Sequence, residues 1–404
     1  MPRTILMLGT LDTKGAEFQF VRDKIIEKGH KVILIDAGVG EHRSLKPDVS
    51  HDEVAQAAGT TIDEIVKQGR EALANELMTK GAVSVVGRLY QSGDVDGIIS
   101  LGGTMGTSLG TAVMRSLPIG IPKVMVSTMA SSDTRVYLDN KDIVMIPSVA
   151  DILGLNPLTK RVLTIAAGAI TGMVELDPGP IRSEKPIIGA TMQGDLMHCM
   201  QLCKQRIEEK GYELITFAAV GAGGKTLEEF IEKRMINGVF DLVPHETIYE
   251  VFDGPLDAGP NRLETAGKKG IPQVIVPGKL DVIAFSSVSG VSERFKGRKT
   301  WMHNPQLGVV RLNKEEMALV GGRLVEKLNR SAGPTGVLIP LRGLSVYGKG
   351  WEEFYDQEAD FALFDMLKKN LKPEIRVLEV NCHINDDLFA EKAADLLDEL
   401  MRIS

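Results

Sequence analysis

The chain has 404 residues, of which 43% are hydrophobic and 25% are charged, and its formal net charge is −7. This length suits two domains of about 150–200 residues each, and the composition is typical of a globular protein with a sizeable core. The negative charge disfavours nucleic acid and anionic membranes as partners. The three cysteines give no disulfide framework, and the sequence shows neither a signal-peptide core nor an apolar run of about 20 residues. We therefore expect a soluble cytoplasmic protein.

The first segment of the chain follows a strand, turn, helix and strand plan. Residues 4–8 form an apolar run, Phe18, Val21 and Ile25 recur at helical spacing, and Gly29 ends the helix before residues 31–36. This order of elements predicts a parallel sheet with a right-handed crossover.

The same plan returns at residues 186–224, where a helical stripe includes Cys199 and Cys203, which we expect to pack in a core. Residues 96–101 and 120–126 also resemble residues 237–242 and 270–276, in the same order. The alternative is the strand, glycine and helix rhythm that all α/β proteins share. We predict an α/β fold with two Rossmann-like doubly wound parallel-sheet subdomains from an internal duplication. They comprise residues 1–178 and 179–404, joined at the Pro/Gly-rich residues 177–180, and the late helices, 313–330 and 385–404, either cover sheet faces or cross back.

Three turns of the first subdomain are expected at the carboxyl edge of its sheet, where helix N-termini offer N–H groups to ligands. The second turn is the strongest candidate, because glycine lets a ligand approach the backbone and hydroxyl groups add donors. The alternative is a tight turn with hydroxyl caps. The candidate nucleotide-binding residues are Gly9, Thr10, Asp12, Thr13 and Lys14 in the first turn, Gly102, Gly103, Thr104, Gly106, Thr107 and Ser108 in the second, and Ser127, Thr128 and Met129 in the third.

Charged residues near these turns have candidate roles of their own. Lys14 would pair with a phosphate, with a solvated surface lysine as the alternative, and Asp12 would cap a helix or hold a metal-bound water. Asp36 ends the second strand and would accept hydrogen bonds from a ribose, with a simple turn residue as the alternative. The first turn lacks the full dinucleotide fingerprint, since Gly9 and Gly15 are its only glycines.

The second subdomain contains a glycine-rich stretch, residues 220–226, that approaches a P-loop. The motif requires glycine at the position of Ala219, and the stretch follows the second strand of its repeat, so we reject a true Walker motif but leave a secondary anion site open. Arg262 is a candidate clamp for a carboxylate or phosphate, and His303 and His383 are candidates for acid–base work. The catalytic residues themselves stay unknown.

Ordered motifs along essentially the whole chain resemble those of the ATP-binding domain family of the tomato mosaic virus resistance protein type, an uncharacterised protein family. The resemblance implies a two-subdomain Rossmann-like protein that binds ATP and forms a homodimer. In plants and fungi a similar module is fused to a TIM-barrel domain, so a separate TIM-barrel protein is a candidate partner. The motifs are Gly9-Thr10 with Asp12-Thr13-Lys14, Gly102-Gly103-Thr104 with Gly106-Thr107, Gly259-Pro260 with Arg262-Leu263, Pro277-Gly278 with Leu280-Asp281, His303-Asn304-Pro305 and His383-Ile384-Asn385-Asp386.

Together these observations predict an ATP-binding protein that acts on a small carboxylate-type metabolite in the cleft between the subdomains. Residues 102–108 would hold the phosphates, and Arg262, His303 and His383 would face the second ligand. Mg²⁺ is expected with the nucleotide rather than in a protein cage of its own. The alternative is a non-catalytic nucleotide-sensing or regulatory module that works with a partner protein, so enzymatic activity is left open. A two-lobed binding protein for an organic ligand fits less well, because that class usually works outside the cytoplasm.

Overall fold

The computed structural model describes residues 1–41, 45–176, 179, 183–286, 290–348 and 354–403. The chain divides into two compact units, Met1–Pro180 and Ile181–Ser404. The expected boundary between residues 178 and 179 falls in a segment of which only Gly179 is described, so the predicted linker lies largely outside the described residues.

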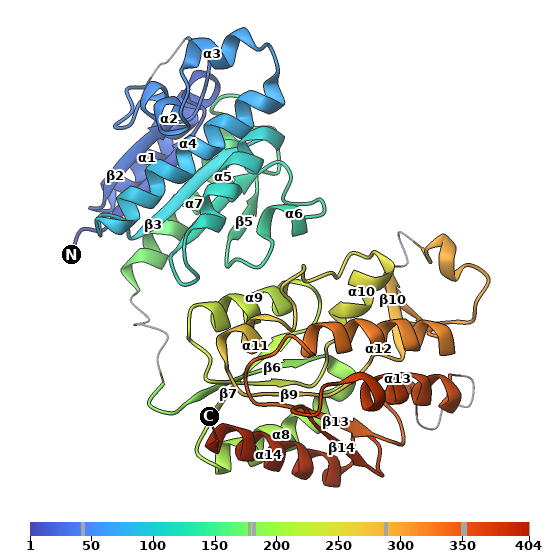
Figure 1. Ribbon diagram of the computed structural model, residues 1–404. Helices are drawn as coiled ribbons and strands as arrows, with labels where there is room; N and C mark the ends of the chain where they lie inside the picture. Colours follow the sequence, from blue (N-terminus) through green and yellow to red (C-terminus); the bar gives the residue numbers. More distant parts are fainter. Residues whose placement is uncertain (42–44, 177–178, 180–182, 287–289, 349–353, 404) are drawn as a thin grey trace. The chain divides into compact units, whose positions relative to one another are not determined.

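Within the described residues, the N-terminal unit forms a five-stranded parallel sheet in the order β2-β1-β3-β4-β5 (Figure 1). The predicted strand–helix–strand opening is confirmed, with α1 (Leu11–Glu27) between β1 and β2. Because the lateral order reverses between β1 and β3, the turns after these two strands lead away to opposite sides and leave a crevice at the carboxyl edge. The strands are β1 (Thr4–Gly9), β2 (Lys31–Asp36), β3 (Gly97–Gly102), β4 (Lys123–Ser127) and β5 (Val144–Pro147).

Helices cover both faces of this sheet, because successive residues of a buried strand point to opposite sides. Ile5 and Met7 of β1 pack in one core with α1 and α7, whereas Leu6 and Leu8 pack in another with α4 and α5. The polar stretch between β2 and β3 folds because Ser50 and Thr61 each form a capping box that starts a short helix. The helices are α2 (His51–Ala57), α3 (Ile62–Lys67), α4 (Glu71–Gln91), α5 (Thr104–Ser116), α6 (Arg135–Leu138) and α7 (Pro157–Glu175).

The C-terminal unit repeats this architecture with one more strand. Its described residues form a six-stranded parallel sheet in the order β14-β13-β9-β8-β6-β7. Read from β7, the first five strands have the same lateral order as the strands of the N-terminal sheet. Residues 237–242 and 270–276 contain β8 and β9, the third and fourth strands of the C-terminal sheet in this order. The predicted duplication is confirmed. The strands are β6 (Ile187–Met192), β7 (Glu213–Ala218), β8 (Gly238–Asp241), β9 (Gln273–Ile275), β13 (Thr335–Pro340) and β14 (Arg376–Val380).

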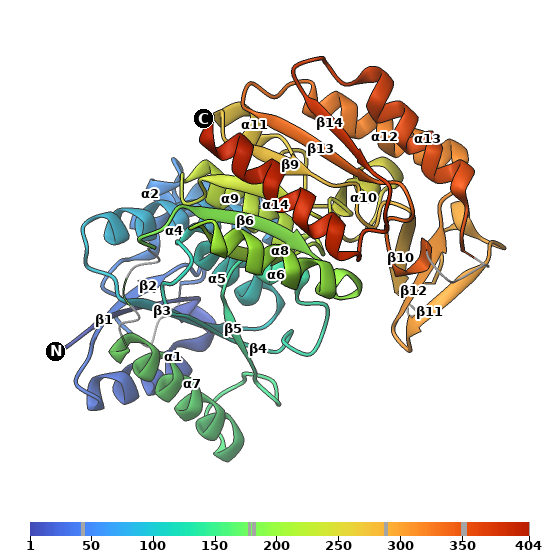
Figure 2. The same cartoon turned by 90° about the horizontal axis from the view of Figure 1, so that it is seen from below.

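Helices again form two layers on this sheet. α8 and α14 lie side by side on one face (Figure 2), and α10, α12 and α13 pack in the core of the other. Cys199 and Cys203 of α8 are fully buried, which confirms their predicted place in a core. Both late helices belong to this unit, where α14 packs against α8 and β13. The helices are α8 (Met197–Glu209), α9 (Ala222–Glu232), α10 (Glu246–Phe252), α11 (Thr265–Lys269), α12 (Lys314–Leu328), α13 (Gln357–Asn370) and α14 (Asp387–Arg402).

A small antiparallel sheet, which the sequence patterns did not predict, is inserted between β9 and β13. Its described strands lie in the order β10-β12-β11 and are β10 (Val282–Ser286), β11 (Thr300–Asn304) and β12 (Leu307–Arg311). Asn304 Oδ1 accepts hydrogen bonds from the N–H groups of Gln306 and Leu307, so the motif at residues 303–305 leads into a hairpin turn. Among the helices that the structure describes, none has the length and apolar character needed to cross a bilayer.

Asp360 of α13 is a buried carboxylate whose charge makes stability depend on pH. Burial raises its pKa to about 7, from an ordinary value of 3.8, although the Arg311 guanidinium donates to its Oδ1 at 2.6 Å and acts in the opposite direction. The folded state therefore binds this proton more tightly than the unfolded state does. The free energy of unfolding should fall as pH rises from about 4 to about 7, by at most about 1.4 kcal/mol for each pH unit.

The variant Asp360→Asn isolates this effect because its side chain is neutral at every pH. We expect the free energy of unfolding of the wild type, minus that of the variant, to fall between about pH 4 and pH 7 and to level off above. Urea titrations followed by tryptophan fluorescence measure it, since Trp301 lies on β11 of the C-terminal unit and the other tryptophan of the sequence, Trp351, falls outside the described residues. A difference that stays constant across this range would contradict the assignment.

Candidate functional site

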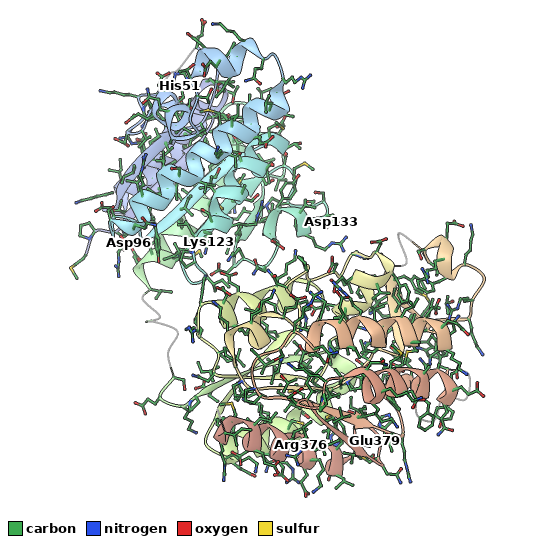
Figure 3. All side chains as sticks on the ribbon, viewed as in Figure 1. His51, Asp96, Lys123, Asp133, Arg376 and Glu379 are labelled. Carbon is green, nitrogen blue, oxygen red and sulfur yellow. The ribbon has the colours of Figure 1, made fainter. Side chains whose placement is uncertain are left out.

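A pocket of about 460 Å³ lies at the carboxyl edge of the N-terminal sheet, where β1, β2 and β3 end. His51 marks this end of the unit in Figure 3, and its Nδ1 lies 3.2 Å from the carbonyl oxygen of Gly38. Asp96 and Lys123 mark the opposite end, beside the amino ends of β3 and β4. The edge residues that line the pocket are Thr10, Asp12, Thr13, Lys14, Ala37, Gly38, Val39, Gly102, Gly103, Thr104, Met105 and Gly106.

The turn after β3 presents backbone donors to this pocket. The N–H group of Thr107 donates to the Gly103 carbonyl at 2.8 Å and starts the α5 hydrogen-bond ladder. The N–H groups of residues 103–106 form no hydrogen bond with any part of the chain that the structure describes. Unpaired amides in the first turn of a helix carry a partial positive charge, so this turn is suited to hold an anion.

Two glycines give this turn its shape and its bare surface. A Cβ at Gly102 would lie 2.8 Å from the Cα of Gly106, so the tight turn requires glycine there. A Cβ at Gly103 would find, among the described atoms within 4 Å, only Thr128 Oγ1 at 3.8 Å. Gly103 is therefore not required by packing, and its missing side chain leaves space in front of the amides.

Helices α3 and α4 supply the other wall of the pocket, which sequence reasoning missed. Arg70, an exposed residue, is the N-cap of α4, and Gly69 before it adopts a positive φ of 59°. The sequence prediction considered strand ends, whereas this wall comes from the polar insertion between β2 and β3. The available signal was the Gly69-Arg70 break between two amphipathic segments. The wall consists of Ile65, Val66, Gly69, Arg70, Glu71, Ala74, Asn75 and Met78.

Lys14 and Asp12 bring opposite charges to the pocket. The Lys14 ammonium has three N–H donors and donates one of them to the Ile152 carbonyl. Asp12 Oδ2 accepts from the Gly40 N–H at 2.7 Å, while its Oδ1 is buried and has no partner in the described structure. A carboxylate oxygen of this kind suits Mg²⁺. Among the described residues, no group of three or more His, Cys, Asp or Glu side chains could hold a metal ion alone.

Asp36, which was predicted to accept hydrogen bonds from a ribose, is engaged inside the fold. The residue is fully buried, and its Oδ1 accepts hydrogen bonds from the N–H groups of Leu11 at 3.1 Å and Gly38 at 2.9 Å. Asp36 therefore anchors the start of α1 and the turn after β2.

Thr107 does not line the pocket, whereas Ser127 lines a hollow that adjoins it. Both are buried, their hydroxyl oxygens are 2.6 Å apart, and Ser127 Oγ also accepts from the Met129 N–H at 2.8 Å. These two hydroxyls join the turns after β3 and β4 and brace them against each other.

The remaining predicted residues of the first unit separate into three groups. Ser108 is exposed on α5 and Gly9 is buried, and neither lines the pocket. A Cβ at Gly9 would lie 2.0 Å from the Phe18 ring, so this glycine serves packing. Thr128 lines an adjoining hollow of about 510 Å³ that shares Gly103 and Thr104 with the pocket. The Met129 sulfur lies 3.5 Å from Thr104 Oγ1.

Arg262 clamps carboxylates of the protein itself, which corrects its predicted role toward a ligand. It is 1% exposed and donates to Glu246 Oε2 at 2.6 Å and to both carboxylate oxygens of Asp241. Glu246 Oε1 in turn accepts from the N–H groups of Gly221 at 2.7 Å and Gly224 at 3.1 Å. The stretch that approaches a P-loop thus holds an internal carboxylate, so the secondary anion site is not available there. Burial raises the pKa of Glu246, and Arg262 opposes this shift.

The two candidate histidines have different surroundings. His383 is buried, with its Nε2 2.9 Å from the Ser345 carbonyl oxygen and its Nδ1 accepting from the Asn385 N–H at 3.1 Å. Both ring nitrogens of His383 are therefore engaged inside the fold, so nothing in this geometry supports its predicted acid–base role. His303 is exposed on β11, and its Nδ1 lies 3.1 Å from the Tyr347 hydroxyl.

These features define a duplicated, Rossmann-like α/β protein with a pocket at the topological switch point of its first sheet. The chain belongs to the uncharacterised protein family UPF0261, whose N-terminal domain matches residues 3–178 and whose C-terminal domain matches residues 185–401. The family resemblance seen in the sequence motifs is confirmed.

Two relatives and one solved structure show the range of similarity. The UPF0261 protein of Clostridium tetani is 44% identical over 402 residues, covering 99% of this chain and 100% of the relative. The ToMV resistance protein Tm-1(GCR237) of Solanum lycopersicum is 35% identical over 341 residues, covering 82% of this chain but 45% of the relative. The Streptomyces sp. SF2575 glycosyltransferase SsfS6, complexed with thymidine diphosphate, is 13% identical with a TM-score of 0.21, covering 68% of this chain and 81% of that one. This TM-score is too low to support a functional comparison.

Proposed function

We propose that the N-terminal unit binds ATP in the pocket at the carboxyl edge of its sheet. The observation that carries this proposal is the run of unpaired amides at residues 103–106, which open a helix and border the pocket. Backbone donors of this kind favour phosphate oxygens through both hydrogen bonding and the helix dipole. Bare glycine at position 103 lets the phosphates approach the backbone.

The other walls suit the remaining parts of a nucleotide. Lys14 and Arg70 supply positive charge near the glycine turn, and Glu71 and Asn75 offer polar atoms for ribose hydroxyls. Apolar side chains are available for a flat base, and the volume of about 460 Å³ lies in the usual range for small-molecule pockets. These apolar residues are Val39, Ile65, Val66, Ala74 and Met78.

Mg²⁺ would accompany the nucleotide and neutralise phosphate charge. The buried, unpaired Oδ1 of Asp12 fits this role, because a magnesium site commonly takes one or two carboxylates and completes its shell with phosphate oxygens and water. Asp12 would hold the ion, while the amides at residues 103–106 hold phosphate oxygens directly.

Turnover separates the two functions that nucleotide binding allows. ATP hydrolysis that depends on a small carboxylate metabolite would favour an enzyme. Binding without turnover would favour a nucleotide-sensing module that works with a partner protein. Of the residues expected to face a second ligand, Arg262 and His383 are engaged inside the fold, and only His303 is exposed. The proposal is therefore limited to nucleotide binding. The hydrolysis assay decides whether a reaction follows.

The first test is calorimetric titration of the full chain with ATP and Mg²⁺, compared between the wild type and Arg70→Gln. We expect saturable binding to the wild type and affinity lower by about tenfold in the variant, because one charge-assisted contact to a phosphate is lost. Affinity for AMP should change less. Arg88→Gln is the matched control, since Arg88 is an exposed arginine of the same helix that does not line the pocket. Absence of binding to the wild type would refute the proposal.

A further inference from the structure

The carboxyl edge of the C-terminal sheet gathers polar side chains that the roles above do not use. The Lys279 ammonium donates to Asp195 Oδ1 at 2.9 Å and lies 5.8 Å from the centroid of the Tyr347 ring. The Asn385 side-chain amide donates to the Asp195 carbonyl at 3.4 Å. These residues follow β6, β9, β13 and β14, so one edge of the sheet brings them together. The C-terminal polar cluster consists of Asp195, Lys279, Asp281, Tyr347 and Asn385.

Three acceptor atoms of the cluster are buried without a hydrogen-bond partner in the described part of the chain. They are Oδ2 of Asp195, Oδ1 of Asp281 and Oδ1 of Asn385. The side chain of Asp195 is 3% exposed and Asp281 is 1% exposed, so bulk water does not serve them. Folded proteins leave few such atoms, because each loses hydration without gaining a bond. Three of them in one cluster point to donors outside the described part of the chain, as a bound ligand would supply.

The backbone and the neighbouring phenol also point to a built site. Lys279 has a φ of +58°, which is uncommon for a residue other than glycine, and its N–H donates to the Leu344 carbonyl at 2.9 Å. Strained backbone of this kind often occurs at ligand sites, where the surrounding structure holds a side chain in place. Burial raises the pKa of Tyr347 to about 12, and the Asp195 and Asp281 carboxylates add to this shift. The phenol therefore stays neutral at physiological pH.

We propose that the C-terminal polar cluster binds a polyhydroxylated small molecule, of the class of sugars, polyols and sugar acids. A hydroxyl group both donates and accepts, so adjacent hydroxyls can donate to the three unpaired oxygens and accept from Lys279. A divalent cation would fit poorly, because the Lys279 ammonium already contacts the Asp195 carboxylate. This site lies in the C-terminal unit and does not depend on the nucleotide pocket of the N-terminal unit.

Calorimetric titration of the full chain with glycerol, D-ribose, D-glucose and D-gluconate tests this inference. We expect at least one of these probes to bind, and Asp281→Asn to weaken that binding by about tenfold or more, because a hydrogen bond to a charged acceptor is lost. Asparagine retains an oxygen for the hydrogen bond from Ser345 Oγ, which is 2.6 Å in the wild type. Asp365→Asn, on the exposed side of α13, is the matched control and should leave affinity unchanged.

Asn385→Ala provides a second variant at a half-buried position, and it should weaken the same probe even if Asp281→Asn folds poorly. Tryptophan fluorescence checks the fold of each variant, and ATP affinity should not change in either. Failure of all four probes to bind would overturn the inference, as would wild-type affinity in both variants. The inference would also be overturned if a crystal soaked in these probes showed only ordered water at the Asp195 and Asp281 oxygens.

Discussion

Gly103→Val is expected to lower the affinity for ATP by at least about a hundredfold while leaving the fold intact. The valine side chain would occupy the space in front of the amides at residues 103–106, where phosphate oxygens must approach. A Cβ at this position meets Thr128 Oγ1 at 3.8 Å, which is an ordinary contact, and the φ of −79° is open to any residue. Calorimetric titration with ATP and Mg²⁺ measures the affinity, and circular dichroism during urea unfolding measures the stability.

Two glycine variants make this result specific. Gly168→Val in α7 is the matched control, because a Cβ there meets no described atom within 4 Å and the residue is exposed. It should keep wild-type affinity. Gly102→Ala should instead lower stability, since its Cβ would lie 2.8 Å from the Gly106 Cα. If Gly103→Val binds ATP as tightly as the wild type, phosphates do not lie against these amides and the proposed site is wrong.

The architecture could be predicted from sequence because it depends on local periodicity and on an internal comparison. The repeated segments at 96–101 and 237–242 occupy the third strand of their sheets, and those at 120–126 and 270–276 the fourth. The antiparallel sheet β10-β12-β11 escaped prediction, because its short strands carry no repeat in the first unit. In particular, the motif that contains His303 and Asn304 was recognised in the sequence, but the hairpin between β11 and β12 was not predicted from it.

The edge of the first sheet that bears the pocket was also predictable, but the individual contacts were not. Strand ends and glycines indicate which turns lie together, and residues 102–106 do line the pocket. Whether a hydroxyl or carboxylate faces a ligand or another part of the chain depends on tertiary partners. Thr107 and Asp36 are examples, since each is engaged inside the fold. Arg70 shows the converse, because its place on the pocket follows from packing of α3 and α4.

Two glycine-rich helix N-termini, that of α5 after β3 and that of α9 after β7, use their amides in different ways, although the two helices are not equivalent in the repeat. At the start of α5 the amides have no partner among the described residues, whereas at the start of α9 the Gly221 and Gly224 amides bind Glu246. Glu246 is held by Arg262, which is buried with it. An internal carboxylate thus occupies the place that an external anion would take. In the second unit, Glu246 therefore stabilises the fold from this position. We expect a large loss of stability when its cation, Arg262, is removed.

Arg262→Met should lower the free energy of unfolding of the C-terminal unit by about 3–5 kcal/mol, because it leaves buried carboxylates without their cation. Asp241, Glu246 and Glu228 all lie within reach of the guanidinium. Burial already raises the pKa values of Glu246 and Glu228, and loss of Arg262 should raise them further. Raised folded-state pKa values favour the folded protein at low pH and cost stability as pH rises. The variant should therefore be closest to the wild type at acidic pH, toward the ordinary glutamate value of 4.5, and should fall further behind it as pH rises.

Urea unfolding followed by tryptophan fluorescence at several pH values measures this effect in the C-terminal unit. Arg330→Met is the matched control, because the Arg330 side chain is 53% exposed and pairs with Glu326 at the surface. Its other partner, Glu264, is 8% exposed and keeps an ion pair with Lys268 when Arg330 is removed. It should change stability by about 1 kcal/mol or less. If Arg262→Met lowered the free energy of unfolding by only about 1 kcal/mol, the buried carboxylates of Asp241, Glu246 and Glu228 would have found other partners. A loss that did not vary with pH would show that packing of the side chain, rather than its charge, stabilises this unit.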